Sequence, residues 1–249
     1  MNEINLSMKP VAIVTGAASN IGLAIARRFK DDYHVLGLDL KFGLTQQDSA
    51  GFDFEVRRCD ITNQDDLLSA FEYARSIGQI AAVVHSAAIS EPRISIKQLS
   101  YESWEKVLKI NLTGTFLLMK TSASYLEESK GAAVFISSRA GKAGFAGFDP
   151  TPVGTKAHYC ASKAGVISLV KSFAIELSPS GARVNGIAPG SIEGEMIPRE
   201  LWAELSKKIP LGRLGRADEV AETARFLCSP AASYITGHIL DVNGGTLMD

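Results

Sequence analysis

Short runs of consecutive apolar residues alternate along the chain with longer segments in which apolar residues recur every three or four positions. Consecutive apolar positions are typical of a strand buried on both faces, whereas the longer spacing is typical of an amphipathic helix. Seven strands are predicted on this basis, at residues 11–14, 35–38, 54–58, 81–85, 133–136, 183–187 and 239–242. The helices expected between them cover residues 21–30, 64–76, 101–128, 159–177 and 218–227.

This alternation of strand and helix is typical of βαβ units, which build a parallel sheet. No repeat or low-complexity linker divides the chain, so residues 1–249 are expected to form one α/β domain. The prediction is a doubly wound parallel sheet of about seven strands with helices on both faces.

Two segments interrupt the pattern. Residues 40–53 are too few and too polar for a full helix, and residues 140–156, with four glycines and two prolines, predict an irregular loop. Ligands bind beyond the carboxyl ends of the strands in such sheets, so the second loop should border the functional site.

Charge and cysteine content exclude several classes of protein. Lys and Arg sum to 26 and Asp and Glu to 27, and a net charge of -1 argues against nucleic-acid binding. Cys59, Cys160 and Cys228 form no CxxC pair, so neither a disulfide framework nor a zinc ribbon is expected, and a reducing compartment fits best. No metal site is expected, because His85 and His158 have no third ligand at a suitable spacing.

Neither a signal peptide nor a membrane span is expected. The first ten residues carry Glu3 and several polar residues where a signal peptide needs a basic start and an apolar run, and about 18 apolar residues nowhere run together without a charged or polar break. The protein is therefore predicted to be cytoplasmic.

The first predicted strand runs into a turn, residues 15–22, that leads into a helix. Backbone N–H groups of such a turn, together with the helix N-terminus, can hold a pyrophosphate. Asn20 occupies a position where glycine is expected, and asparagine tolerates positive φ better than most residues. A plain strand-to-helix turn is the alternative. The predicted cofactor-binding residues of the turn are Gly16, Ser19, Asn20, Ile21 and Gly22.

Asp39 ends the second strand 17 residues after Gly22, where a carboxylate accepts hydrogen bonds from the adenosine ribose of a dinucleotide. A carboxylate at this point repels a 2′-phosphate, and Lys41 is the nearby cation that could pair with one. NAD is therefore predicted in preference to NADP. A solvated acid at a strand end is the alternative reading of Asp39.

Tyr159 and Lys163 stand four residues apart at the start of a predicted helix, so their side chains share one face. The preceding strand ends in Ser137 and Ser138, which adds a hydroxyl to the same crevice. A phenol with a free pKa of about 10 is a poor base at neutral pH. Lowering that pKa by two to three requires roughly 3–4 kcal/mol, which a close ammonium and an oxidised nicotinamide can supply. Tyr159 is the expected acid and base for proton exchange with an alcohol or carbonyl oxygen.

These motifs, in this order, resemble the short-chain dehydrogenase/reductase family, which has a Rossmann fold, and the resemblance covers nearly the whole chain. They are the turn at 15–22, Asp60-Ile61-Thr62, Asn111 within 110–114, Ser137-Ser138, the segment 159–163, and Arg183-Val184-Asn185 with Pro189-Gly190.

The resemblance implies a role for each matching residue. Asp60 and Ile61 would contact the adenine, and Asn111 would hold a water in a proton relay. Ser138 would hold the substrate oxygen, Tyr159 would be the acid and base, and Lys163 would bind the nicotinamide ribose and lower the tyrosine pKa. The further cofactor contacts implied are Ser86, Ala87, Pro189 and Ile192.

The chain also departs from the family pattern. His85-Ser86-Ala87-Ala88 replaces the usual Asn-Asn-Ala-Gly, and Gly194 replaces a threonine that commonly bonds the nicotinamide carboxamide. The 21-residue separation of Ser138 and Tyr159 is longer than is usual in the family. This insertion is the best indication of an unusual substrate, and residues 192–202 resemble the family's substrate-binding segment.

The loop between Ser138 and Tyr159 carries Arg139, Lys142 and Lys156 against Asp149 alone. This excess of positive charge hints at an acidic substrate such as a carboxylate or sulfonate, with solvated loop charges as the alternative.

The helix at 159–177 is apolar on more than one face, so it either contacts a partner subunit or is a core helix of a monomer. The resemblance makes a homotetramer the first expectation and a dimer the next. The predicted function is NAD-dependent interconversion of a secondary alcohol and a ketone, both small molecules. An NADPH-dependent ketoreductase such as a 3-oxoacyl reductase is the alternative enzyme, and a catalytically silent dinucleotide-binding scaffold is the alternative outside enzymes.

Overall fold

One parallel sheet runs through the computed structural model, which describes residues 9–43, 51–147 and 154–248. Its strand order is β3-β2-β1-β4-β5-β6-β7, and every neighbouring pair is parallel. The seven-stranded doubly wound sheet is therefore confirmed. The strands are β1 (Val11–Thr15), β2 (His34–Asp39), β3 (Glu55–Arg58), β4 (Ile80–His85), β5 (Ala132–Ile136), β6 (Arg183–Pro189) and β7 (Ile239–Val242).

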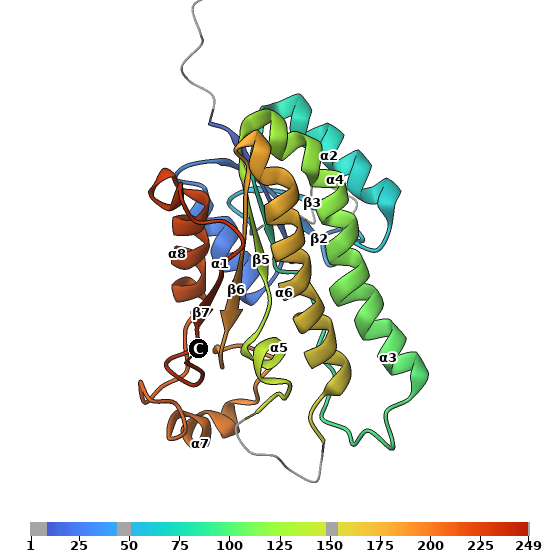
Figure 1. Cartoon of the computed structure of the whole chain (residues 1–249), viewed down its shortest axis with the longest axis vertical. Coiled ribbons are helices and arrows are strands. Elements are labelled where there is room, and N and C mark those ends of the chain that lie inside the picture. Colours follow the sequence, from blue (N-terminus) through green and yellow to red (C-terminus); the bar gives the residue numbers. More distant parts are fainter. Residues whose placement is uncertain (1–8, 44–50, 148–153, 249) are drawn as a thin grey trace, which may run out of the picture.

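Helices cover both faces of the sheet (Figure 1). On one face lie α2 (Gln64–Ile77), α4 (Gly114–Ser129) and α6 (Ala157–Leu177), which share a core of buried residues with the strands. On the other face lie α1 (Asn20–Phe29) and α8 (Ala217–Cys228), which enclose a second core. Because apolar side chains leave the central strands on both sides, each strand reads as a continuous apolar run in the sequence.

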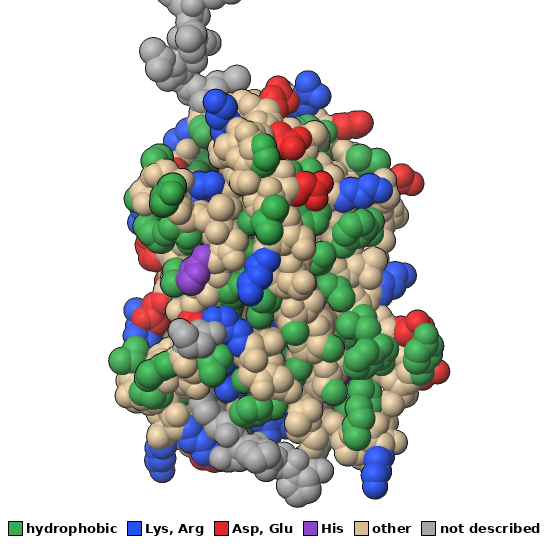
Figure 2. Space-filling view, in the orientation of Figure 1, with side chains coloured by type: hydrophobic (Ala, Val, Ile, Leu, Met, Phe, Trp, Pro, Cys, Tyr) green, Lys and Arg blue, Asp and Glu red, His purple; other side chains and the backbone are tan. Residues whose placement is uncertain are grey.

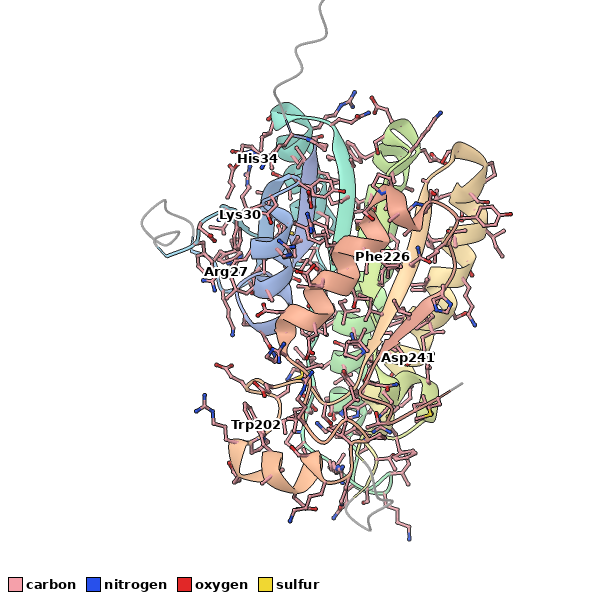
Figure 3. All side chains as sticks on the ribbon, turned by 90° about the vertical axis from the view of Figure 1, so that its left-hand side faces the viewer. Arg27, Lys30, His34, Trp202, Phe226 and Asp241 are labelled. Carbon is pink, nitrogen blue, oxygen red and sulfur yellow. The ribbon has the colours of Figure 1, made fainter. Side chains whose placement is uncertain are left out.

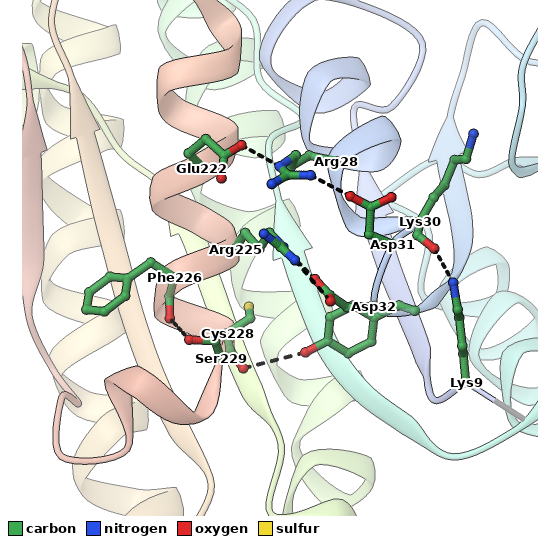
Figure 4. A network of polar contacts seen from close by, with 11 residues as sticks. Lys9, Arg28, Lys30, Asp31, Asp32, Glu222, Arg225, Phe226, Cys228 and Ser229 are labelled. Atoms are coloured by element: carbon green, nitrogen blue, oxygen red, sulfur yellow. Dashed lines mark hydrogen bonds and ion pairs between the residues drawn. The ribbon is translucent and has the colours of Figure 1, made fainter. Parts of the chain in front are cut away.

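Helices α1 and α8 lie side by side, as Figure 3 shows from the side of the molecule. Ion pairs at the surface join α8 to α1 and to the turn after it: Arg28 of α1 contacts Glu222, and Arg225 contacts Asp32, just beyond α1, at 2.5 and 3.1 Å (Figure 4). These pairs are exposed and screened by solvent, so their contribution is small, and the apolar core beneath them holds the helices in place.

The single helix expected at 101–128 is interrupted. It consists of α3 (Tyr101–Leu108), a π-helical turn (Lys109–Thr113) and α4, which follow one another without a break in the chain. The π-turn contains Asn111, and such turns frequently occur at functional sites. The apolar spacing continues through the turn, which is why the sequence pattern predicts one unbroken helix.

Short helices gather at the carboxyl edge of the sheet, at the lower end in Figure 1. They are α5 (Arg139–Ala143) and α7 (Trp202–Ser206), with a 3₁₀ turn at Arg199–Leu201; two further 3₁₀ turns lie at Ser178–Ser180 and Pro230–Ala232. The expected loop at 140–156 therefore begins within a short helix, and its residues 148–153, including Asp149, lie outside the described residues. The helix-free connection predicted at 40–53 holds for 40–43 and 51–53, while 44–50 lie outside the described residues.

None of the helices in the described ranges is long and apolar enough to cross a membrane.

Candidate active site

The turn between β1 and α1 can be built only with glycine at two positions. Gly16 has φ +70°, and a Cβ there would lie 2.7 Å from the backbone nitrogen of Ala87. A Cβ on Gly22 would lie 2.6 Å from the carbonyl carbon of Gly16. The side chain of Ser19, the N-cap residue of α1, accepts no hydrogen bond from the first turn of the helix. These features fit a bound pyrophosphate, because the backbone leaves space for it and uncapped N–H groups lie at the helix N-terminus.

His85 changes how this turn is held against β4. The N–H groups of Ser86 and Ala87 donate to Thr15 Oγ1 at 3.3 and 3.4 Å. The Thr15 hydroxyl therefore donates to Nδ1 of His85, 2.7 Å away. Burial, reinforced by the charge of Lys163, lowers the pKa of His85 to about 3, so the ring is neutral and its proton resides on Nε2. By bonding the Thr15 hydroxyl, which in turn accepts from the N–H of Ala87, His85 supports the close contact between Ala87 and Gly16.

Asp39 lies across from the glycine-rich turn. Its Oδ2 accepts from the N–H of Ala18 at 3.1 Å, and its Oδ1 accepts from the N–H of Lys41 at 3.0 Å. Both bonds fix the carboxylate at the carboxyl end of β2, beside the turn. The predicted contact with a ribose fits this position, since a carboxylate oxygen accepts more than one hydrogen bond.

The two residues expected at the adenine have different surroundings. Asp60 accepts from the N–H and the hydroxyl of Thr62, both at 2.8 Å, and so stabilises the turn before α2. Ile61 is buried, and its side chain packs where a Cβ on Gly114 would lie, 2.9 Å from Ile61 Cδ1. Their adenine contacts remain predictions.

The structure brings Ser138, Tyr159 and Lys163 together beyond the end of β5. Ser138 is the N-cap of α5 and accepts from the N–H of Ala140 at 3.1 Å, while its hydroxyl also hydrogen-bonds to the Tyr159 phenol. The Lys163 ammonium lies 5.9 Å from the centre of the Tyr159 ring and donates to the carbonyl of Ile136 at 2.8 Å. The hydroxyl, the phenol and the ammonium thus meet in one place, as the spacing predicts.

The pKa values at this site differ from the expectation. Burial raises the pKa of Tyr159 above its ordinary value, although the residue keeps some exposure, and the hydrogen bond from Ser138 opposes this only in part. Burial lowers the pKa of Lys163 to about 8. The expected lowering of the tyrosine pKa by Lys163 is therefore wrong for the protein alone. The Lys163 ammonium donates to the Ile136 carbonyl. Burial of the phenol disfavours its charged form more than the hydrogen bond from Ser138 favours it.

Asn111 is fully buried in the π-turn and holds the segment after β4. Its Oδ1 accepts from the N–H of Ile89 at 2.8 Å, and its Nδ2 donates to the Ile89 carbonyl at 2.9 Å and to Ser162 Oγ at 3.2 Å. Ser162 lies on α6, one residue before Lys163. Asn111 therefore links the chain beyond β4 to the helix that carries Tyr159, and its place in a proton relay remains a prediction.

Two other predicted cofactor residues lie at the end of β6 and just beyond it. Pro189 is the last residue of the strand and is buried, and the Ile192 side chain packs where a Cβ on Gly215 would lie, 2.7 Å from Ile192 Cδ1. A bridge between Ile192 and Gly215 fixes the backbone here. Their cofactor contacts, like those of Ser86 and Ala87, remain predictions. In the described ranges no cluster of His, Cys, Asp or Glu could hold a metal ion.

The loop cations are not equivalent. Lys142 forms an ion pair with Asp241 at 2.5 Å, so counting it as a charge available to substrate is wrong. Arg139 is buried and donates to the carbonyl of Gly147. Lys156 donates to Ser90 Oγ at 2.9 Å, and its pKa is lowered by burial and by the charge of a neighbouring arginine, Arg93. Arg93 is absent from the predicted site, because no sequence motif marks its approach to Lys156 from the segment after β4.

The fold and site define a dinucleotide-dependent oxidoreductase: a glycine-rich turn that can hold a pyrophosphate faces a hydroxyl, a phenol and an ammonium at one edge of a parallel sheet. Comparison with known proteins agrees. Residues 16–246 match a family model described as enoyl-(acyl carrier protein) reductase. The chain belongs to the short-chain dehydrogenase/reductase family, whose members act as oxidoreductases on CH–OH groups and the corresponding ketones. The alternative of a silent scaffold is set aside on this ground.

Similar proteins match over nearly their whole length. The chain is 35% identical to cis-4-hydroxycyclohexanecarboxylate dehydrogenase of Sinomonas cyclohexanicum, over 94% of this chain and 95% of the relative. It is 34% identical to 3-oxoacyl-(acyl-carrier-protein) reductase of Aquifex aeolicus, over 98% and 99%. The crystal structure of gox2181 superimposes with a TM-score of 0.84 at 32% identity, covering 96% of both chains.

Proposed function

We propose that the protein is an NAD-dependent dehydrogenase that interconverts a secondary alcohol and a ketone, with Tyr159 as acid and base. The observation that carries this proposal is the meeting of the Tyr159 phenol, the Ser138 hydroxyl and the Lys163 ammonium at one point beyond β5. A phenol and a hydroxyl that share a hydrogen bond can both bond one substrate oxygen, which is what proton transfer to or from that oxygen requires.

The protonation states suit the direction of ketone reduction at neutral pH. Because the pKa of Tyr159 is raised, its phenol is protonated and can donate to a carbonyl oxygen held by Ser138. With a pKa of about 8, Lys163 is mostly charged and can bond ribose hydroxyls. A bound nicotinamide supplies the hydride, and its oxidised form adds a positive charge that favours the phenolate needed for alcohol oxidation.

Asp39 supports NAD as the cofactor. Its carboxylate is fixed beside the glycine-rich turn by two backbone bonds, where a 2′-phosphate would be repelled. Direct titration with NAD(H) and NADP(H) at one ionic strength tests this choice. A lower dissociation constant for NAD(H) is expected, and a preference for NADP(H) would overturn it.

The acid and base role is tested with Tyr159→Phe, which removes the phenol oxygen and keeps the ring. Turnover should fall by about 10²–10⁴-fold while the dissociation constant for NADH changes little. Tyr234→Phe, at a fully exposed tyrosine, is the matched control and should retain turnover. Full activity of the Tyr159→Phe variant would contradict the proposed role.

A second candidate is an NADPH-dependent ketoreductase such as a 3-oxoacyl reductase. The relative from Aquifex aeolicus favours it, and so does the protonated state of Tyr159, which suits reduction. Preference for NADP(H) in the titration above, together with reduction of a 3-oxoacyl thioester, would select this candidate.

The substrate is proposed to carry a carboxylate. Lys156 and Arg93 bring two positive charges together in a partly buried place, and neither forms an ion pair with another described residue. An anion would relieve their repulsion. The relative from Sinomonas cyclohexanicum supports this, because the substrate in its name is a secondary alcohol that bears a carboxylate.

We also propose a homotetramer in a reducing compartment, the cytoplasm. An apolar groove of about 350 Å³ lies between α6 and the junction of the π-turn with α4, and Figure 2 shows hydrophobic side chains over these helices. It is lined by Leu112, Thr113, Phe116, Gly165, Ser168 and Leu169. A second copy of the chain is the proposed occupant, and light scattering would measure the mass.

The three cysteines support a reducing compartment, since all three are buried and free.

A further inference from the structure

Two departures from the family pattern meet at the cofactor side of the site. Asn20 stands where the glycine-rich turn usually has a second glycine, and Gly194 stands where a threonine is usual. The two positions are far apart in the sequence. In the structure they are in contact: a Cβ on Gly194 would lie 2.8 Å from Cγ of Asn20 and closer still to Nδ2. Because Cβ atoms do not approach other heavy atoms so closely, the Asn20 carboxamide occupies the space that a side chain at 194 would need.

Neither position can readily move away from the other. Asn20 begins α1 with φ +43°, a left-handed conformation that asparagine tolerates. Gly194 follows a segment anchored to Gly215 by two backbone hydrogen bonds, from Glu193 N–H to the Gly215 carbonyl at 2.9 Å and from Gly215 N–H to the Ser191 carbonyl at 3.0 Å. Gly194 itself has φ +152°, which strains any residue with a side chain. The backbone therefore holds the two residues side by side, and a side chain at 194 would displace the Asn20 carboxamide from its place.

The carboxamide of Asn20 forms no hydrogen bond with the part of the chain that the structure describes, and it is only partly exposed. It offers two donors and an acceptor at the junction of the pyrophosphate turn with the segment after β6. Solvent reaches this carboxamide in the free protein, and a ligand with complementary polar groups would take the place of that water. The nicotinamide carboxamide has such groups, because two amides can each donate and accept.

We propose that Asn20 and Gly194 are an exchanged pair, in which the Asn20 side chain replaces the missing side chain at 194 and hydrogen-bonds the nicotinamide half of the dinucleotide. The inference rests on the proposed function, since it requires a nicotinamide dinucleotide as the ligand. It predicts that substituting either residue alone weakens NADH binding, whereas substituting both together leaves NADH binding close to that of the wild type.

A double-mutant cycle tests this coupling. The variants are Asn20→Gly, Gly194→Thr and the double variant, with dissociation constants for NADH and for ADP-ribose, which lacks the nicotinamide, measured by titration. Asn20→Gly should weaken NADH binding about tenfold, the equivalent of about 1.4 kcal/mol, and leave ADP-ribose binding unchanged. Gly194→Thr should weaken NADH binding by tenfold or more, because its side chain collides with Asn20. The double variant should bind NADH within about threefold of the wild type.

The control is Lys130→Gly, which removes another left-handed side chain, with φ +53°, at the end of α4. It should leave both dissociation constants unchanged, and thermal unfolding of every variant shows whether it folds. If the double variant weakened NADH binding by the product of the two single effects, the two residues would act independently and the coupling would be overturned. Equal weakening of NADH and ADP-ribose by Asn20→Gly would overturn the assignment to the nicotinamide half. If wild-type protein bound no nicotinamide dinucleotide, the proposed function itself would fail, which is a different result from an uncoupled cycle.

Discussion

Replacing Lys163 by methionine is expected to change how the stability of the protein depends on pH. The side chain is 3% exposed, and its ammonium donates to the Ile136 carbonyl. Methionine has a similar length and carries no charge, so it fills the same space. The variant should lose turnover, because no other described ammonium lies at the Tyr159 ring.

The magnitude follows from the pKa of Lys163, which burial lowers from 10.5 to about 8. This change corresponds to about 3 kcal/mol in favour of the neutral amine in the folded state. Below pH 8 the folded protein bears the full cost of the buried charge. Between pH 8 and 10.5 the unfolded chain binds more protons than the folded one at this residue, so stability rises with pH. From pH 7 to 9.5 the rise amounts to about 2 kcal/mol.

Urea unfolding of both proteins at pH 7 and pH 9.5, at one protomer concentration, measures this effect. The free energy of unfolding of the wild type, minus that of the Lys163→Met variant, should increase by about 2 kcal/mol between the two pH values. Lys171→Met, at an exposed lysine of the same helix, is the control and should show a flat difference. A flat or falling difference for Lys163→Met would refute the claim that burial destabilises the charged form.

Three further predictions concern the cofactor, the fold around the site and the substrate. Asp39→Asn should lower the ratio of the NADP(H) to the NAD(H) dissociation constant at least tenfold, because it removes a charge close to the 2′-position; an unchanged ratio would show that Asp39 does not set the preference. Asn111→Ala leaves the N–H and carbonyl of Ile89 without partners and should lower the free energy of unfolding by about 2–4 kcal/mol in urea titrations, whereas a loss within error would mean that water replaces the amide. Lys156→Met should raise KM for carboxylate-bearing alcohols and not for neutral ones, and equal effects on both would argue against an acidic substrate.

The sequence predicts those parts of the fold that depend on local pattern. Strands such as β5 are recognised because all their residues are buried, and the helix carrying Tyr159 and Lys163 follows from its spacing. The π-turn at Asn111 is missed because the apolar spacing continues through it. The pairing of Lys142 with Asp241 is missed because it joins residues 99 positions apart. The direction of the Tyr159 pKa is missed because it depends on how much protein surrounds the phenol, which spacing does not reveal.

Departures from the family motif are best interpreted by what each residue contacts in the fold. His85 replaces an asparagine, yet its ring accepts from Thr15 and leaves the Thr15 oxygen free to hold the turn. Burial keeps that ring neutral, so no charge is added beside Lys163. Considered alone, each departure from the motif suggests a weakened cofactor site. Considered with its neighbour, the His85 substitution preserves the support of the glycine-rich turn, because the Thr15 oxygen needs a partner that accepts its proton and a neutral imidazole does so as well as a carboxamide.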